Sequence, residues 1–77
     1  HKTENSMIEF ELKEGSEYIE LIKLLKAVNL VNSGAEAKLM VEEGNVMLND
    51  EVEYRKRAKI RPGDVVYFMD NEITVIK

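Results

Sequence analysis

The sequence predicts a single α+β domain in which two short helices pack on a small, mostly antiparallel sheet. Apolar and polar residues alternate near the N-terminus and again in the last third of the chain, which is typical of half-buried strands. Between these regions, apolar residues recur at helical spacing. The chain has 77 residues and no cysteine, so it has room for one compact core that holds together without disulfides.

The N-terminal part is expected to hold a strand and a helix. The strand runs from Met7 to Lys13, where apolar and charged residues alternate. Residues 1–6 contain no apolar side chain and are expected to be a disordered leader or a vector-derived remnant, so that 7–77 forms the domain. Ser16 is the expected N-cap of a helix that ends near Val28. The apolar stripe of this helix is Tyr18, Leu21, Ile22, Leu25 and Val28.

A second helix is expected to begin at Ser33. The run Ser33-Gly34-Ala35-Glu36 has the spacing of a capping box, in which the serine and glutamate side chains each accept a hydrogen bond from a free backbone N–H. Gly44 follows where a residue in the left-handed region commonly ends a helix. The expected buried face of this helix comprises Ala37, Met40 and Val41.

Three turns are predicted in the second half of the chain. Asn49-Asp50 tolerates the positive φ of a tight hairpin turn. Pro62-Gly63 matches the central positions of a type II turn. A final hairpin is expected to pair Val65–Met69 with Ile73–Ile76 across Asp70-Asn71.

Residues 54–61 concentrate positive charge in an otherwise acidic chain. They carry five of the eleven lysines and arginines, whereas the formal net charge of the protein is −4. In an extended strand, one face of this segment would carry Arg55, Arg57, Lys59 and Arg61. Like charges side by side on a strand repel, which favours an anionic partner such as a row of phosphates. The competing interpretation is a solvated strand whose charges are balanced by Glu51, Glu53 and Asp64.

The composition disfavours several classes of function. The chain has no cysteine and a single histidine, His1, and it carries neither a glycine-rich phosphate loop nor a Ser–His–Asp set. We therefore expect no catalysis, no metal site, no cofactor and no small-molecule substrate. The longest apolar run, Val65–Met69, is far shorter than the roughly 20 residues of a membrane span, so no membrane association is expected. A cysteine-free chain of this size fits the cytoplasm.

The combined spacing of these motifs resembles the RNA-binding domain of the ribosomal protein S-four type. The resemblance covers about residues 17–69 and rests on Ser33, Ala37, Gly44, Val46, Asn49 and Pro62-Gly63-Asp64. Within that superfamily, the runs Ser33–Lys38 and Arg55–Lys59 look most like the small stand-alone YbcJ-like proteins of bacteria. The resemblance implies an alpha-L-like RNA-binding motif built from the two helices and the strand that follows them.

The resemblance also implies a function, the non-catalytic binding of structured RNA, which we expect to be ribosomal RNA or its precursor. Such binding reads shape and phosphates more than sequence, and DNA is not expected as a partner. The predicted RNA contacts are Lys38, Arg55, Lys56, Arg57 and Lys59, with Arg61 added from the shared strand face. Many family members are basic where this chain has Gly34 and Leu39, and many have glycine where it has Asp50, which shifts the expected contact toward residues 55–59. The alternative is a protein-interaction or assembly module whose basic strip meets an acidic protein partner.

Overall fold

The computed structural model describes residues 6–77, which form two helices and seven strands. In chain order these are β1 (Ser6–Glu11), β2 (Ile19–Glu20), α1 (Leu21–Ala27), α2 (Gly34–Glu42), β3 (Val46–Leu48), β4 (Glu51–Val52), β5 (Lys59–Ile60), β6 (Val65–Phe68) and β7 (Asn71–Ile76). Five strands form one sheet in the order β1-β7-β6-β3-β4, and β2 pairs with β5 in a separate ribbon. Only the β1–β7 pair is parallel among the strand pairs described, so the predicted α+β class with a mostly antiparallel sheet is confirmed.

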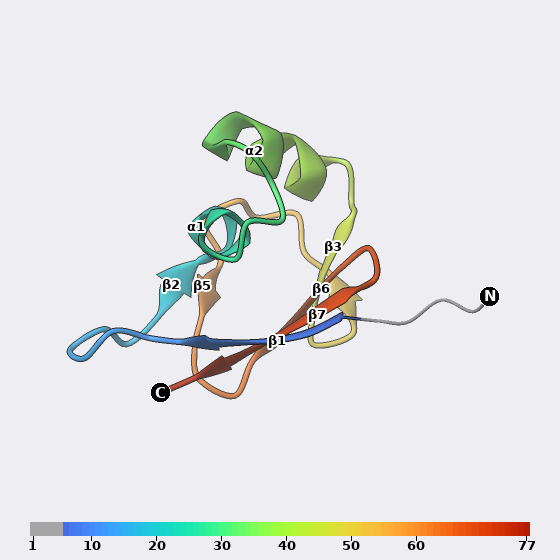
Figure 1. Ribbon diagram of the computed structural model, residues 1–77. Coiled ribbons are helices and arrows are strands. Elements are labelled where there is room, and N and C mark those ends of the chain that lie inside the picture. The colour runs from blue at the N-terminus through green and yellow to red at the C-terminus, as the bar shows by residue number, and fades with distance from the viewer. Residues whose placement is uncertain (1–5) are drawn as a thin grey trace.

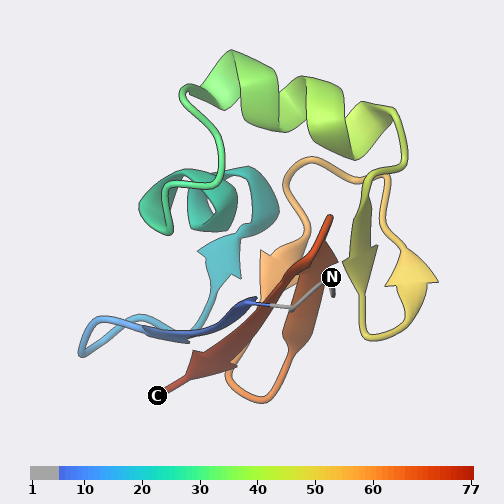
Figure 2. The same cartoon turned by 45° about the vertical axis from the view of Figure 1, so that its right-hand side comes forward.

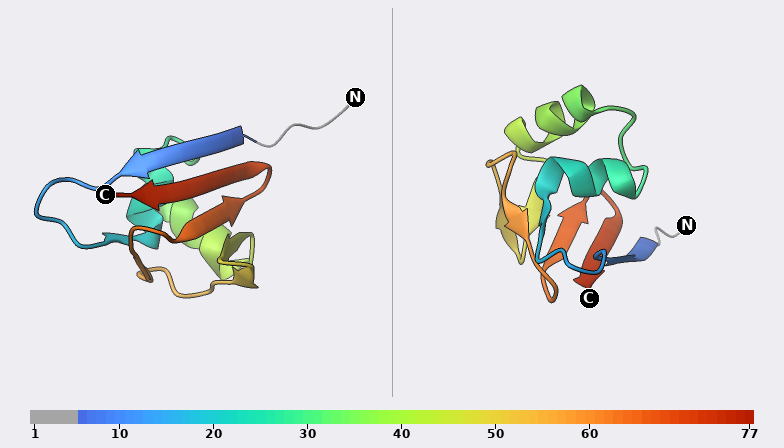
Figure 3. Two further views of the ribbon diagram at one scale, coloured as in Figure 1. Left: turned by 90° about the horizontal axis from the view of Figure 1, so that it is seen from below. Right: turned by 90° about the vertical axis from the view of Figure 1, so that its left-hand side faces the viewer.

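The two helices lie on the same side of the five-stranded sheet (Figure 1). The β2–β5 ribbon lies beneath α1 and beside the sheet (Figure 2). From below, β1, β7 and β6 are seen next to one another (Figure 3). The basic segment of residues 54–61 leaves this sheet at β4, which is the edge opposite β1.

One hydrophobic core connects the helices, the sheet and the ribbon. Helix α1 contributes Leu21, Leu24 and Leu25, which are fully buried. Each such side chain stabilises the fold by about 1.5–3 kcal/mol relative to an exposed one. The other buried residues of this core are Leu12, Val31, Ala37, Val41, Val46, Ala58, Ile60, Val66, Phe68, Ile73 and Val75.

Helix α2 begins and ends as its sequence predicts. The backbone N–H of Glu36 donates to Oγ of Ser33 at 3.2 Å, and the Glu36 carboxylate accepts from the backbone N–H of Asn32 at 2.8 Å. The glutamate therefore reaches one residue further back than in the usual capping box. At the other end Gly44 has φ of +80°, and its N–H and that of the next residue each donate to a helix carbonyl at 3.1 Å. This pattern is the Schellman motif.

The turns at Asn49-Asp50 and Pro62-Gly63 also form as predicted. Asn49 and Asp50 have φ of +50° and +76°, as the two central residues of a type I′ turn require. Gly63 has φ of +96°, and the backbone N–H of Asp64 closes the turn by donating to the Arg61 carbonyl at 2.9 Å.

The final hairpin closes one residue earlier than predicted. Met69 and Asp70 form its turn, with Met69 at φ of +56°, and Asn71 is already the first residue of β7. The Asn71 side-chain amide donates to the carbonyl of Phe68 at 3.2 Å. The predicted turn at Asp70-Asn71 is wrong because Asn71 closes the turn with its side chain while its backbone pairs in the ladder.

The predicted first helix is wrong in its first turn. Helix α1 begins at Leu21 rather than after Ser16, and its N-cap Glu20 makes no side-chain capping bond. The residues just before α1 instead pair as β2 with β5, so a long-range contact overrides the local capping signal. Leu24, which lies outside the predicted stripe, is fully buried, whereas Tyr18 is 41% exposed.

The N-terminal strand differs in its bounds and in its partner. It begins at Ser6, one residue inside the predicted leader, and the remainder of that leader, residues 1–5, lies outside the described residues. The strand ends at Glu11, two residues before the predicted end at Lys13. Its parallel pairing with β7 joins the two ends of the described chain, and no local pattern in the sequence predicts that pairing.

Candidate nucleic-acid interface

The basic segment of residues 54–61 does not form the continuous strand that its alternation predicts. Between β4 and β5, Lys56 and Arg57 form a turn in which the N–H of Ala58 donates to the carbonyl of Arg55 at 3.2 Å. The carbonyls of Lys56 and Ala58 then accept from the first two N–H groups of α1, at 3.3 and 2.9 Å respectively. These N–H groups have no partner within the helix, so the bend is favoured over a straight strand because it satisfies them.

The bend nevertheless gathers four of the predicted cationic side chains around one depression, which we call the arginine hollow. It has a volume of about 470 Å³, and it is lined by Arg55, Arg57, Ala58, Lys59 and Arg61. Ala58 is buried and the four charged residues are exposed. These four cations therefore line one depression. Only Lys59–Ile60 of the segment forms a strand, so the extended strand face expected from the alternation is not what brings them together.

A second depression, the lysine hollow, lies between α1, α2 and the turn. It has a volume of about 370 Å³, and it is lined by Glu20, Ile22, Lys23, Lys38, Lys56 and Arg57. Arg57 lines both hollows, so the two depressions adjoin at this residue. We call the six predicted contacts that line them the basic surface: Lys38, Arg55, Lys56, Arg57, Lys59 and Arg61.

Three cations of the basic surface are held by carboxylates of the protein itself. The two shortest contacts, each 2.9 Å, join Lys56 Nζ to Glu42 Oε2 and Arg55 Nε to Glu53 Oε2. A third and longer contact of 3.9 Å joins Arg57 Nε to Glu20. Within residues 6–77, no ion pair involves Lys38, Lys59 or Arg61. Three of the six cations are therefore paired with carboxylates, as the competing interpretation of a charge-balanced segment expects. Of the carboxylates which that interpretation names, only Glu53 takes part in these pairs.

The pair of Arg55 and Glu53 is the best organised of the three. The Glu53 carboxylate accepts from the Arg55 guanidinium at 2.9 and 3.2 Å and from the Arg55 backbone N–H at 2.9 Å. These hydrogen bonds hold the pKa of Glu53 below its ordinary value, against the opposing effect of its burial. The Arg55 side chain itself remains 77% exposed, so solvent screens the pair and a competing anion can displace it.

Two residues near the basic surface have positions that the sequence pattern does not reveal. Lys23 faces solvent on α1, as its place outside the apolar stripe predicts, but it also lines the lysine hollow. Tyr18 was expected in the core, yet its ring lies outside the core cluster and beneath the Lys59 ammonium. Tyr18 lies outside the core because α1 begins only at Leu21, so this residue belongs to the extended segment before the helix.

The described part of the chain offers neither a metal cluster nor a membrane-spanning helix. Residues 6–77 contain no group of three or more His, Cys, Asp or Glu side chains arranged to hold a metal ion. None of the helices among these residues has the length and apolar character needed to cross a membrane.

The sequence comparison gives the family of this chain. The chain belongs to the S4 domain family, whose model matches residues 10–76. The predicted resemblance to this family is therefore confirmed.

Two curated relatives and one solved structure are similar to this chain. The Escherichia coli "Putative RNA-binding protein YbcJ" is 41% identical over 59 residues, which cover 77% of this chain and 84% of the relative. The Bacillus subtilis "Probable ribosome maturation protein RlbA" is 39% identical over 51 residues, covering 66% and 72% respectively. The solution structure of E. coli YbcJ, described as having an alpha-L motif involved in RNA binding, matches with a TM-score of 0.71 and 38% identity. The match covers 100% of this chain and 95% of the chain in the YbcJ structure. The predicted alpha-L-like fold is confirmed by this match.

Proposed function

We propose that this domain binds structured RNA, specifically ribosomal RNA or its precursor, through the basic surface and without catalysing a reaction. The observation that carries the proposal is the junction at Arg57, which lines both hollows and so joins all six predicted cations into one surface. A continuous set of cations matches the regular spacing of phosphates along a folded RNA better than scattered charges do.

The charge distribution supports a localised contact rather than general attraction. The protein carries a formal charge of −4, so RNA is not drawn to the molecule as a whole. Charges beyond about 8 Å are largely screened at physiological salt, so a phosphate at the basic surface responds mainly to the nearby cations. RNA therefore docks in one orientation, with the basic surface toward the backbone.

The names of the relatives favour ribosomal RNA over an acidic protein as the partner. One relative is named as RNA-binding and another as a ribosome maturation protein. An S4 domain with this fold and this surface is suited to the same kind of ligand. The competing protein-interaction role predicts that the purified protein carries no RNA, whereas our proposal predicts absorbance at 260 nm that ribonuclease removes.

The test replaces two cations of the arginine hollow and compares them with two cations elsewhere. The test variant is Arg55→Gln with Arg57→Gln, and the matched control is Lys13→Gln with Lys77→Gln, which changes the net charge equally. Lys13 and Lys77 line a different depression, near the end of β1, that shares no residue with either hollow. Affinity for a ribosomal RNA fragment is measured against salt concentration, with melting temperatures recorded for each variant.

The two variants should behave differently. Each lost phosphate contact lowers the slope of log affinity against log salt by about 0.7 to 0.9, so the test variant should lose roughly twice that. The control should keep the wild-type slope, and both variants should melt near the wild-type temperature because all four side chains are exposed. Equal slopes for the test variant and the wild type would rule out the basic surface as the RNA contact.

A further inference from the structure

The β2–β5 ribbon has an outer face that the core does not use. In its ladder Ile19 lies opposite Ile60, and Glu20 lies opposite Lys59. Ile60 is fully buried and Ile19 packs against the core, so these two side chains define the inner face. Alternation along both strands therefore places on the outer face Tyr18, Glu20, Lys59 and Arg61.

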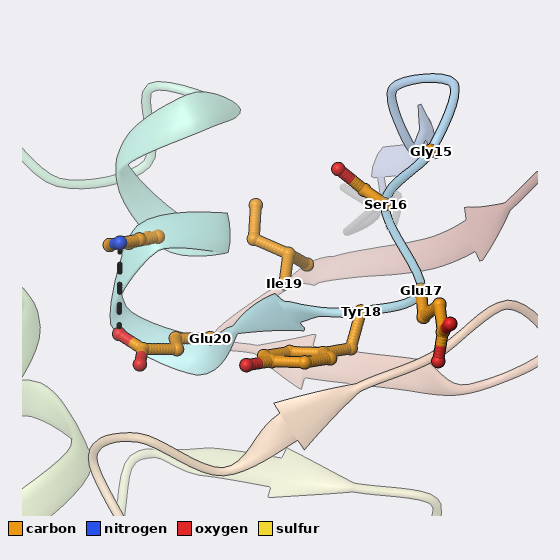
Figure 4. A pocket seen from close by; sticks show the side chains of 7 residues that line it. Gly15, Ser16, Glu17, Tyr18, Ile19 and Glu20 are labelled. Atoms are coloured by element: carbon orange, nitrogen blue, oxygen red, sulfur yellow. Dashed lines mark ion pairs between the residues drawn. The ribbon is translucent and has the colours of Figure 1, made fainter.

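Tyr18 is the aromatic residue of this outer face. Its ring lies on the opposite side of the strand from Ile19 (Figure 4). The Lys59 ammonium lies 5.0 Å from the centre of the ring, a distance at which a cation is attracted to the π-system. Since 41% of Tyr18 is exposed, part of the ring remains open to a further partner.

A third depression, the tyrosine hollow, lies beside this ring. Its volume is about 470 Å³, within the range of pockets that enclose small organic groups. Besides Tyr18 it is lined by Gly15, Ser16, Glu17, Ile19, Glu20 and Lys23. Figure 4 shows it along the segment that leads into β2, with a dashed line for the 4.0 Å contact between Glu20 and Lys23.

The arginine hollow and the tyrosine hollow differ in charge, although Lys59 contacts both regions. It lines the arginine hollow, which is purely cationic apart from Ala58, and its ammonium also lies against Tyr18. The tyrosine hollow instead contains the carboxylates of Glu17 and Glu20. Carboxylates repel phosphate but accept hydrogen bonds from amino groups of nucleobases.

A nucleotide has a base and a phosphate, and this region offers a suitable contact for each: an aromatic ring beside carboxylates for the base, and cations for the phosphate. We propose that Tyr18 is a stacking platform for an unpaired nucleobase of the bound RNA, whose phosphate lies at Lys59 and Arg61. The preferred ligand is then an RNA helix carrying a bulged or splayed nucleotide with an amino group, rather than an uninterrupted duplex. The proposal rests on the function proposed above and specifies the class of RNA.

The purely structural alternative is that Tyr18 only covers the aliphatic stem of Lys59 and stabilises the ribbon. The two roles differ in what they require of the side chain. Packing needs apolar volume, which leucine also supplies, whereas stacking needs a flat π-face. Tyr18→Leu therefore separates the roles, and Tyr18→Phe is its control because the ring is retained.

The test uses two short RNA hairpins that differ in one nucleotide. One carries a single bulged 2-aminopurine, whose fluorescence is quenched by stacking, and the other is its fully paired counterpart. With the wild-type protein and with Tyr18→Phe, the bulged hairpin should bind more tightly than the paired one, and its fluorescence should fall on binding. With Tyr18→Leu, affinity for the bulged hairpin should drop by about 5- to 150-fold, whereas affinity for the paired hairpin should hardly change.

The outcomes separate this inference from the function on which it rests. If both hairpins bind with a strong dependence on salt, but Tyr18→Leu changes neither affinity nor fluorescence, the stacking platform is refuted and RNA binding stands. If Tyr18→Leu weakens both hairpins equally, or lowers the melting temperature enough to explain the loss, the structural alternative is correct. If neither hairpin nor a ribosomal RNA fragment binds, both proposals fall.

Discussion

Replacing Glu42 with glutamine should increase RNA affinity with little cost in stability. Glu42 Oε2 lies 2.9 Å from Lys56 Nζ, and the two side chains are 52% and 43% exposed. An exposed pair of this kind stabilises the fold by about 0.2–1 kcal/mol, and a phosphate that takes Lys56 must first overcome it. Glu42→Gln removes this competition, so affinity should rise by about 1.5- to 5-fold.

The stability of the Glu42→Gln variant follows from where this residue lies. Glu42 is the last residue of α2, where a negative charge is unfavourable by about 0.3–1 kcal/mol because the helix dipole is negative there. Loss of the ion pair and relief of this repulsion have similar size and opposite sign. The free energy of unfolding, measured in urea, should therefore change by less than about 1 kcal/mol.

The matched control for this experiment is Glu43→Gln. Glu43 is the next residue, it is exposed, and the substitution changes the net charge equally, but Glu43 takes part in none of the ion pairs described for residues 6–77. Both variants should gain from the weaker overall repulsion of RNA, and only Glu42→Gln should gain the release of Lys56. Titrations with a fluorescently labelled RNA hairpin measure the difference, and equal gains for the two variants would refute the argument.

Three further predictions concern the fold. Glu53→Gln should make the melting temperature fall less steeply in acid. Arg55 lowers the folded pKa of Glu53 below its ordinary 4.5, so this carboxylate stabilises the native state above that pH. Its contribution disappears as pH falls through the folded pKa, and the variant has no such contribution to lose. An unchanged pH profile would contradict this. Gly44→Ala should lower the free energy of unfolding in urea by about 1–2 kcal/mol, because φ is +80° and the new Cβ would lie 3.3 Å from the Tyr54 ring. Ser33→Ala should cost about 0.5–2 kcal/mol through the lost cap, and no change in the urea midpoint would argue against the capping bond.

The elements that the sequence predicts correctly are those whose signals are local. Helix α2 has nine residues, with a capping serine directly before it and a left-handed glycine just beyond its C-cap. The Asn49-Asp50 turn and the Pro62-Gly63 turn depend on backbone preferences of the turn residues themselves. In each case the residues that determine the structure are close together in the chain, so that a single sequence is enough.

Two of the errors occur where distant segments compete with a local signal. Ser16 and the residues after it have a plausible helical pattern, but pairing with β5 extends the chain up to Glu20. The basic segment has a regular alternation, but its carbonyls are needed by the first N–H groups of α1 and it bends. Neither competition can be seen without knowing which segments meet in the fold.

The membership of the candidate site stays a prediction, and the structure changes the form in which its cations come together. The six cations do gather around two adjoining hollows, although the strand that motivated four of them is bent. Lys38, which was selected by family resemblance, meets this group because α2 lies beside the turn. The Leu39 side chain is 49% exposed, so the chain leaves an apolar group on the surface of α2.

Chemical-shift mapping tests the central claim most directly. The nitrogen-15-labelled protein is titrated with a structured ribosomal RNA fragment, and amide shifts are followed across residues 6–77. We predict that the shifts concentrate at Lys38 and residues 55–61, with the amides of β1 and β7 unchanged. Shifts centred on β1 and β7, or none at RNA concentrations that saturate binding, would contradict the proposal that the basic surface is where this domain holds RNA.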